Sequence, residues 1–172
     1  ASESHPYVTT GGLAGVVGSL PKALARAGHN VRICIPLYAR IDRARHGIRP
    51  LQSMCVHMGT GEVWCALHQC EHGDGVKTIF VERDDLFGRA GVYDEKGQSY
   101  HDNLGRFAFL CKAALQSCKD TGWIPDIVHS HDWQGAAAPV FRKTWDAWDS
   151  PLSHSASVLT IHNLAYQGQG EK

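Results

Sequence analysis

The chain has 172 residues, of which 43% are hydrophobic and 20% are charged, which is ordinary globular usage and excludes wholesale disorder. Seventeen Lys and Arg residues balance seventeen Asp and Glu residues, so no net basic charge favours nucleic acid or an anionic membrane as a partner. No stretch approaches the ~20 consecutive apolar residues of a membrane-spanning helix.

The start of the chain and its cysteines indicate the context in which it folds. The sequence begins at Ala1 with no initiator Met, and it lacks the basic and apolar runs of a signal peptide. We therefore expect 1–172 to be one incomplete domain, an internal piece of a longer protein. The six cysteines include no C-x-x-C pair, which favours buried, reduced thiols over disulfides.

The first half of the chain predicts one helix followed by four strands. Apolar residues at helical spacing predict the helix, and Gly28 ends it. The helix is expected over 12–27, and the strands over 31–37, 48–58, 62–70 and 76–82. Because short glycine-containing turns at 59–61 and 72–75 separate the last three strands, we expect them to form a short antiparallel hairpin excursion.

The second half alternates helix-like and strand-like segments. Residues 84–102 are rich in Gly and Asp and predict a long surface loop, of a length that is often functional. A helix is expected from Asn103 to Gly122, a second helix over 134–148, and strands over 124–128 and 156–161. This alternation predicts an α/β fold with a parallel sheet that helices cover on both faces.

A glycine-rich cluster, Thr9-Thr10-Gly11-Gly12-Leu13-Ala14-Gly15-Val16-Val17-Gly18, precedes and opens the first helix. Glycines allow the backbone to approach a ligand closely, and the free N–H groups at a helix start favour anions. The cluster matches neither G-x-G-x-x-G nor a P-loop. A tight turn with close helix packing would explain the same residues.

Two histidine-containing clusters follow predicted buried strands, where an open parallel sheet binds its ligands. They are His129-Ser130-His131-Asp132-Trp133-Gln134 and Ile161-His162-Asn163-Leu164. In the first, the residues could bind a polar ligand, or hold a metal ion if further ligands existed. Alternatively, Asp132 could cap the next helix while Trp133 packs beneath it. His162 could likewise be a structural histidine.

Four strings in this order resemble the start of bacterial glycogen synthases and plant starch synthases, the ADP-glucose-dependent glucan synthases. The first string combines Thr10-Gly11-Gly12-Leu13 with the helix through Leu24 and Gly28-His29. The second is Asp102-Asn103 with Arg106-Phe107. The third and fourth are 125–134 and 161–168. The resemblance covers nearly the whole chain.

The resemblance implies the N-terminal domain of a GT-B glycosyltransferase, with a Rossmann-like parallel sheet. In that family a first strand precedes the Ala1-Ser2-Glu3 string, and a C-terminal domain completes the cleft; neither lies in this sequence. The parent would transfer glucose from ADP-glucose to the non-reducing end of an α-1,4-glucan, glycogen or starch, with retention. The fragment alone is expected to be inactive. Its partners would be both substrates and its own C-terminal domain.

The same resemblance suggests the site residues. His162 would be catalytic, because it would contact the transferred glucose and stabilise the developing charge. The substrate-binding residues would be Thr9, Gly11, Gly12, Tyr93, Asp132, Trp133 and Asn163. We expect no metal and no cofactor beyond the donor ADP-glucose, and a bacterial cytoplasmic location with a plastid as the alternative.

The sequence departs from the family at two positions of the glycine-rich cluster. Thr9 stands where the family has a lysine near the donor's phosphates, and Gly15 stands where it has an aspartate. Loss of a charge beside a diphosphate predicts weaker donor binding. A sugar-binding remnant without catalysis is therefore an alternative. A metal-dependent hydrolase built on His129, His131 and Asp132 is another.

Overall fold

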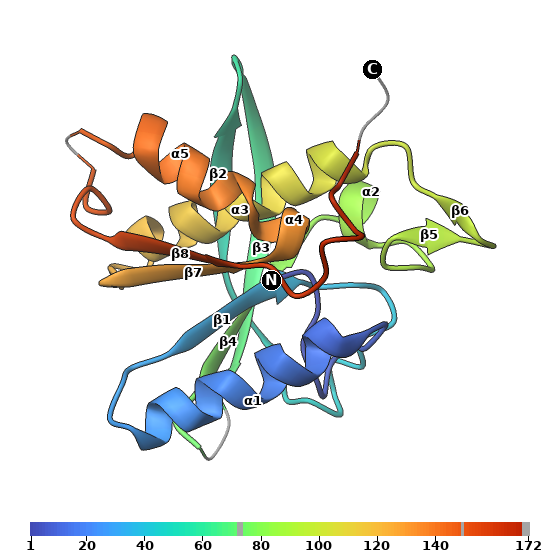
Figure 1. Ribbon diagram of the computed structural model, residues 1–172, viewed down its shortest axis with the longest axis horizontal. Coiled ribbons are helices and arrows are strands. Elements are labelled where there is room, and N and C mark those ends of the chain that lie inside the picture. The colour runs from blue at the N-terminus through green and yellow to red at the C-terminus, as the bar shows by residue number, and fades with distance from the viewer. Residues whose placement is uncertain (72–73, 149, 170–172) are drawn as a thin grey trace.

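The computed structural model describes residues 1–71, 74–148 and 150–169 (Figure 1). The predicted turn over 72–75 lies partly outside these residues. In chain order the elements are α1 (Gly12–Arg26), β1 (Arg32–Pro36), β2 (Arg49–Met58), β3 (Gly61–Glu71), β4 (Lys77–Glu82), α2 (Asp84–Phe87), β5 (Asp94–Glu95), β6 (Gln98–Ser99), α3 (Asn103–Asp120), β7 (Ile127–His131), α4 (Asp132–Gly135), α5 (Ala137–Thr144) and β8 (Ala156–Thr160).

The strands form two main sheets, with parallel pairs in each. One sheet has the order β1-β4-β3-β2, in which β1 and β4 are parallel and the β2–β3 and β3–β4 pairs are antiparallel. The other consists of the parallel pair β7 and β8. The α/β fold and the antiparallel excursion are confirmed. The excursion is long rather than short, because β2 and β3 contain 10 and 11 residues.

The helices cover opposite faces. Figure 1 shows α1 on one side of the sheets and α3 with α5 on the other. Apolar residues at 104, 107, 108, 111, 114, 115 and 118 have the 3.6-residue spacing of one helix face. Of these, Phe107, Cys111 and Leu115 are buried, whereas Leu104 at the start of α3 is exposed. Tyr38, Phe80 and Phe87 are fully buried in the same core, which lies between α3 and the four-stranded sheet.

Two prolines explain where the predicted elements of the second half were wrong. The strand expected over 124–128 forms at Ile127–His131, because Pro125 has no N–H to donate to a sheet. The helix expected over 134–148 is divided into α4 and α5. Pro139 cannot donate to the carbonyl four residues earlier, so the helical hydrogen bonding is interrupted near Gly135.

The long loop over 84–102 is held by a buried arginine. Arg106 of α3 is fully buried and donates hydrogen bonds to the carbonyls of Leu86 and Val92, at 2.6 and 3.1 Å. It also donates to Oδ1 of Asn103 at 2.6 Å. The loop contains α2 and the two-residue strands β5 and β6. Its base is therefore fixed against α3.

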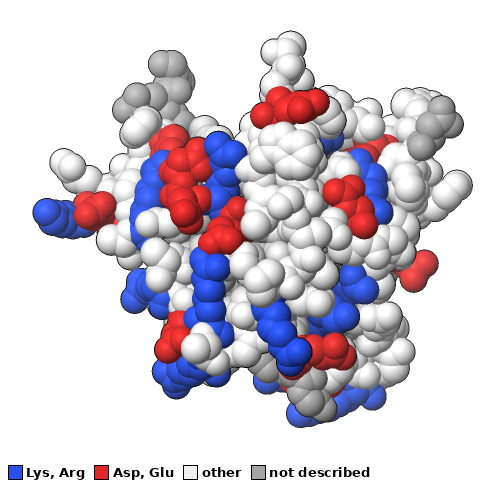
Figure 2. All heavy atoms as spheres, turned by 180° about the vertical axis from the view of Figure 1, so that it is seen from behind, with Lys and Arg blue, Asp and Glu red and all other residues white. Residues whose placement is uncertain are grey.

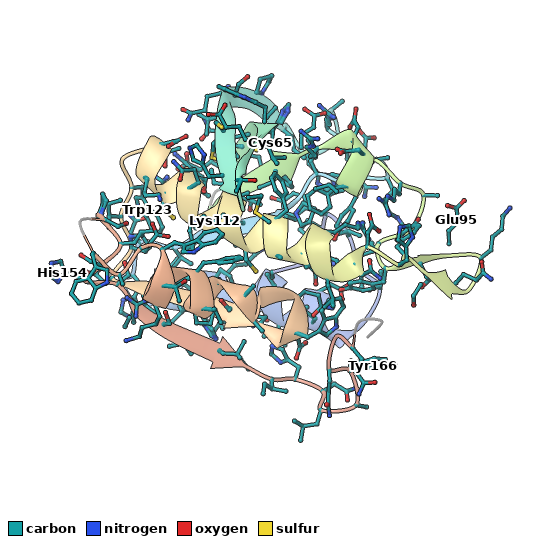
Figure 3. The ribbon with its side chains drawn as sticks, turned by 90° about the horizontal axis from the view of Figure 1, so that it is seen from above. Cys65, Glu95, Lys112, Trp123, His154 and Tyr166 are labelled. Atoms are coloured by element: carbon teal, nitrogen blue, oxygen red, sulfur yellow. The ribbon has the colours of Figure 1, made fainter. Side chains whose placement is uncertain are left out.

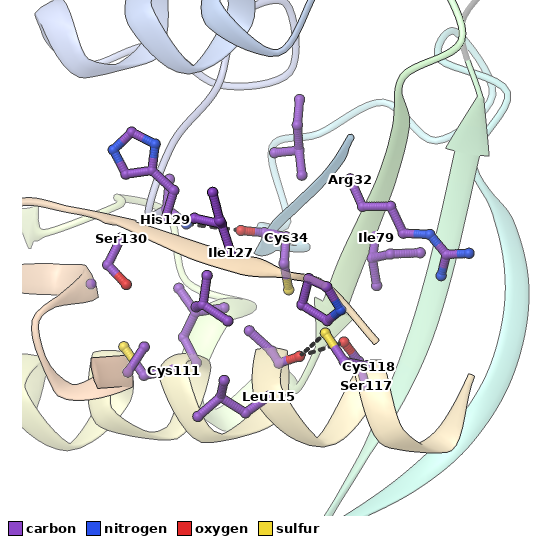
Figure 4. Close-up of a pocket in the computed structure, with 18 of the residues that line it drawn as sticks. Arg32, Cys34, Ile79, Cys111, Leu115, Ser117, Cys118, Ile127, His129 and Ser130 are labelled. Carbon is purple, nitrogen blue, oxygen red and sulfur yellow. Dashed lines mark hydrogen bonds between the residues drawn. The ribbon is translucent and has the colours of Figure 1, made fainter. Parts of the chain in front are cut away.

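A slot lies between β1 and β7, at the junction of the two sheets (Figure 4). Its cavity volume is about 140 Å³. The walls are mainly apolar and include Ile33, Ile79, Leu110, Leu115 and Ile127. Among the described residues, no strand pairs with both β1 and β7.

On the face seen in Figure 2, basic and acidic side chains are interspersed, so this face carries no patch of purely positive or purely negative charge.

All six cysteines are free thiols. Burial raises the pKa of Cys34 to about 12 and that of Cys118 to about 11, so these thiols are poor nucleophiles. In the described part of the chain, none of the helices combines the length and the apolar character needed to cross a bilayer.

Candidate active site

The parallel pairing of β7 with β8 brings the two histidine clusters together. The register places His131 opposite Thr160, so the residues that follow each strand emerge side by side. His131 Nδ1 lies 3.0 Å from His162 Nε2. Contacts between residues about thirty positions apart in the sequence therefore follow from one strand pair.

Three imidazole rings are stacked at this strand end. The ring centroids of His129 and His131 are 4.3 Å apart, and those of His131 and His162 are 5.3 Å apart with planes inclined by only 11°. His129 Nε2 lies 2.7 Å from the Thr160 hydroxyl. The innermost ring, His131, is buried, whereas His162 is exposed. The stack thus connects the interior to a solvent-facing imidazole.

Burial keeps His131 neutral. Burial is the largest of the causes that together lower the pKa of His131 to about 3, and the charges of His129 and His162 act in the same direction. Burial also lowers the pKa of His129, with the charge of His162 as the next cause. A neutral His131 can accept a hydrogen bond from His162 through Nδ1, which would orient the exposed ring.

Asp132 fixes the backbone beside His162. Its Oδ1 accepts a hydrogen bond of 2.6 Å from the backbone N–H of His162. The alternative in which Asp132 caps the following helix is wrong, because the side chain makes no bond to the start of α4. Asp132 has a φ of +53°, a left-handed conformation that non-glycine residues adopt at a cost and mostly at functional positions.

The glycine-rich cluster is anchored from inside by Glu3. One carboxylate oxygen of Glu3 accepts the backbone N–H and the hydroxyl of Thr10, at 2.6 and 2.8 Å, and the N–H of Gly11 at 3.3 Å. Glu3 itself is buried. The N–H of Gly11, expected near the substrate, is thus engaged inside the protein.

The next turn of the cluster remains open to a ligand. No atom lies within 4 Å of the position that a Cβ on Gly12 or Gly15 would take. Both residues are exposed and lie at the start of α1, where the first backbone N–H groups have no partner within the helix. The protein's own packing therefore does not require glycine at either position.

A layer of aromatic side chains joins the glycine-rich cluster to the histidines. Tyr93 donates to Glu3 Oε1 at 3.2 Å, and its ring contacts Phe107 with centroids 5.7 Å apart. Trp133 packs edge-on against Phe107 at 5.2 Å. A Cβ on Gly168 would come within 2.4 Å of the Trp133 ring, so the segment after β8 covers the indole closely. Tyr93 and Trp133 therefore support the surrounding loops of the site through their packing on Phe107.

The remaining predicted residues lie at the surface. Thr9 is exposed immediately before the glycine-rich turn. Asn163 is exposed, and its Oδ1 accepts the N–H of Ala165 at 2.9 Å. The chain from 161 to 167, which includes the Tyr166 labelled in Figure 3, is exposed and extends beyond β8.

The groups proposed as metal ligands from the sequence have other partners. Nδ1 of His131 faces His162, and Oδ1 of Asp132 binds a backbone amide. The first ring of the run, His129, is bonded to Thr160. Within this run, His131 and Asp132 contact His162, whereas His129 contacts Thr160.

Sequence reasoning missed Glu3 as a residue of the site. It belongs to none of the conspicuous motifs and precedes the first predicted element. Its buried carboxylate nevertheless joins Thr10, Gly11 and Tyr93. The sequence feature that could have indicated this role is the position of Glu3, an acidic residue in the short segment directly before the glycine-rich turn.

These features define an α/β domain with a polar site at the ends of parallel strands, as in the N-terminal domain of a GT-B fold. The model of the starch synthase catalytic domain family matches residues 1–172, and the chain belongs to this family. The chain is 44% identical over 171 residues to glycogen synthase 1 of Geobacter sulfurreducens, covering 98% of this chain and 34% of that protein.

Two further comparisons agree. Glycogen synthase of Treponema denticola is 39% identical over 169 residues, covering 97% of this chain and 34% of that protein. The solved catalytic domain of starch synthase IV from Arabidopsis thaliana, bound to ADP and acarbose, matches with a TM-score of 0.85 and 30% identity. That match covers 97% of this chain and 34% of the solved one. The chain spans about a third of the length of the relatives it matches.

Proposed function

We propose that the protein to which this chain belongs transfers glucose from ADP-glucose to the non-reducing end of an α-1,4-glucan, with retention. The observation that carries the proposal is the placement of His162. Asp132 holds its backbone, buried His131 contacts its ring, and the ring itself is exposed. The similar Arabidopsis structure was solved with ADP and acarbose, a nucleotide and a sugar-like ligand.

In this proposal each part of the site has a distinct role. The exposed start of α1, with the open positions Gly12 and Gly15, receives the donor's phosphates or glucose through backbone N–H groups. His162 contacts the transferred glucose and stabilises the positive charge that develops on it. Asn163 and Thr9 lie at the exposed edge of this site. Tyr93 and Trp133 act mainly by supporting the loops above them.

The second wall of the cleft is proposed to come from the C-terminal domain of the same protein. Closure of the two domains would exclude water and bring the donor onto His162. The reaction would use no metal and no cofactor besides the donor. The bacterial relatives favour a location in the bacterial cytoplasm.

The experiment that tests this function compares the full-length parent with residues 1–172 alone. The parent is expected to transfer labelled glucose from ADP-glucose to glycogen, and the chain alone is expected to show none, because half of the cleft is absent. Glucan binding by the parent without any transfer would support the sugar-binding alternative. Turnover by residues 1–172 would contradict the need for a second wall.

A substitution at Thr9 tests the phosphate end of the site. Thr9→Lys in the parent should tighten ADP-glucose binding or raise transfer by about 5- to 30-fold. The basis is that a charge-assisted contact exceeds a neutral one by ~1–2 kcal/mol. The gain should shrink at higher salt. Thr60→Lys, which adds the same charge at the β2–β3 turn, is the matched control and should change neither quantity. Unchanged or weaker affinity in Thr9→Lys would reject the assignment.

A further inference from the structure

The β2–β3 hairpin brings three different metal-binding side chains to one place, far from the histidine stack in sequence. One ligand atom each from Cys55, His57 and Glu62 lies within 4.8 Å of the other two. In Figure 1 the tip of this hairpin projects beyond α3 and α5. None of these residues belongs to the site described above.

The strand register accounts for the grouping. Cys55 and His57 are two residues apart on β2, so they share one face of the sheet. His57 pairs directly with Glu62 of β3, and such cross-strand partners have Cβ atoms roughly 5 Å apart. The intervening residue, Val56, is fully buried on the opposite face. The three ligands therefore stand on the outer face of the hairpin.

The hairpin holds this arrangement firmly. The pairing continues without interruption from Gln52–Leu67 to Met58–Gly61, at the turn. Gly59 has a φ of +61°, the left-handed conformation that a tight turn needs. The backbone that carries the three side chains is thus ordered before any ligand binds, and only side-chain rotation is required.

The ligand set has a specific chemical preference. A thiolate, an imidazole and a carboxylate are the usual donors to Zn²⁺, and three protein ligands with a water molecule complete a tetrahedral site. Bonds of ~2.0–2.3 Å place ligand atoms roughly 3.5 Å apart, so a side-chain movement of about 1 Å would close the group. Cys55 and His57 are accessible, since the first is half-buried and the second exposed.

The surrounding charge favours a cation. The negative charges of Glu62 and Asp120 lie close enough to Cys55 to act on its thiol. Asp120 is the last residue of α3, which lies along this hairpin. A divalent cation would offset that negative charge and would convert the thiol to the bound thiolate.

We propose that Cys55, His57 and Glu62 form a Zn²⁺ site on the outer face of the β2–β3 hairpin, with an open fourth position for water or for a ligand from a partner. The site is independent of sugar transfer. It ties the two strands together close to their exposed turn.

The test uses the full-length parent, titrated with Zn²⁺ against a chromophoric chelator and, separately, with Co²⁺. Co²⁺ is expected to produce a thiolate-to-metal charge-transfer band in the near ultraviolet. Cys55→Ser should abolish this band, and His57→Ala should weaken Zn²⁺ binding by at least about tenfold, since even outer-shell partners have effects of that size. Cys118→Ser and His101→Ala are the matched controls and should retain both signals.

The histidine stack is the competing location for a metal, and one variant separates the two. His162→Ala should retain the thiolate band and the Zn²⁺ affinity. Loss of binding in His162→Ala with retention in Cys55→Ser would overturn the proposal, as would the absence of any thiolate band in the unmodified protein. These outcomes are independent of whether the parent transfers glucose.

Discussion

Replacing His162 by alanine in the full-length parent is expected to lower the rate of glucosyl transfer by ~10²-fold or more, the scale for removal of one aimed polar stabiliser. The melting temperature should shift little. The side chain is exposed, and its backbone N–H, which binds Asp132, is retained in the variant. The hydrogen bond from its ring to His131 can be replaced by water. Initial rates with ADP-glucose and glycogen, together with thermal melts, measure both effects.

The control for this variant is His154→Ala, which removes another exposed imidazole outside the site. It should leave the transfer rate unchanged. A His162→Ala enzyme with normal activity would show that the ring takes no part in the reaction. A variant that fails to fold would show that His162 is structural. Either result rejects the catalytic assignment.

The fold should lose stability in mild acid because of His131. Its pKa in the folded protein is about 3, far below the ordinary value of 6.5. Between these two values the unfolded chain binds a proton that the folded chain does not bind. This contribution to stability is therefore complete above pH ~6.5 and is lost as the pH falls toward ~3, with a slope of up to ~1.4 kcal/mol per pH unit.

The His131→Gln variant isolates this contribution. Glutamine keeps a polar side chain but cannot be protonated, so the acid dependence of the free energy of unfolding should be shallower than in the unmodified protein. Denaturant melts of both proteins from pH 7 to pH 4 supply the comparison. His101→Gln, at an exposed position, serves as the control and should follow the unmodified protein. Parallel pH dependences for all three proteins would contradict a neutral, buried His131.

Much of the architecture could be predicted because local pattern and final structure agree. The stripe of α3 and the apolar run of β8 specify their elements directly, and the positions of His129, His131 and His162 after strands predicted their meeting at one edge. The predicted boundaries of β7 and of the following helix were wrong because the missing backbone N–H of proline counted for more than the pattern of apolar side chains. Pro125 and Pro139 lack an N–H, which moved the start of β7 and divided the expected helix.

Other parts of the site depend on contacts that no local pattern encodes. Glu3 reaches residues seven and ninety positions away, and nothing around it in sequence indicates those partners. The left-handed conformation of Asp132 accompanies its bond to the His162 backbone, and that bond needs β7 and β8 to be paired. Tyr93 and Trp133 could be placed near the site, but the direction of their rings depends on packing against Phe107.

The register of β7 against β8 also determines where this chain can change in length. A residue added before Ala156, the first paired residue of β8, does not by itself shift the pairing of His131 with Thr160. A single residue inserted between Ser157 and Ile161 would instead turn every following side chain to the other face. His162 would then be carried away from both His131 and Asp132. Insertions should therefore be restricted more strongly within β8 than before it.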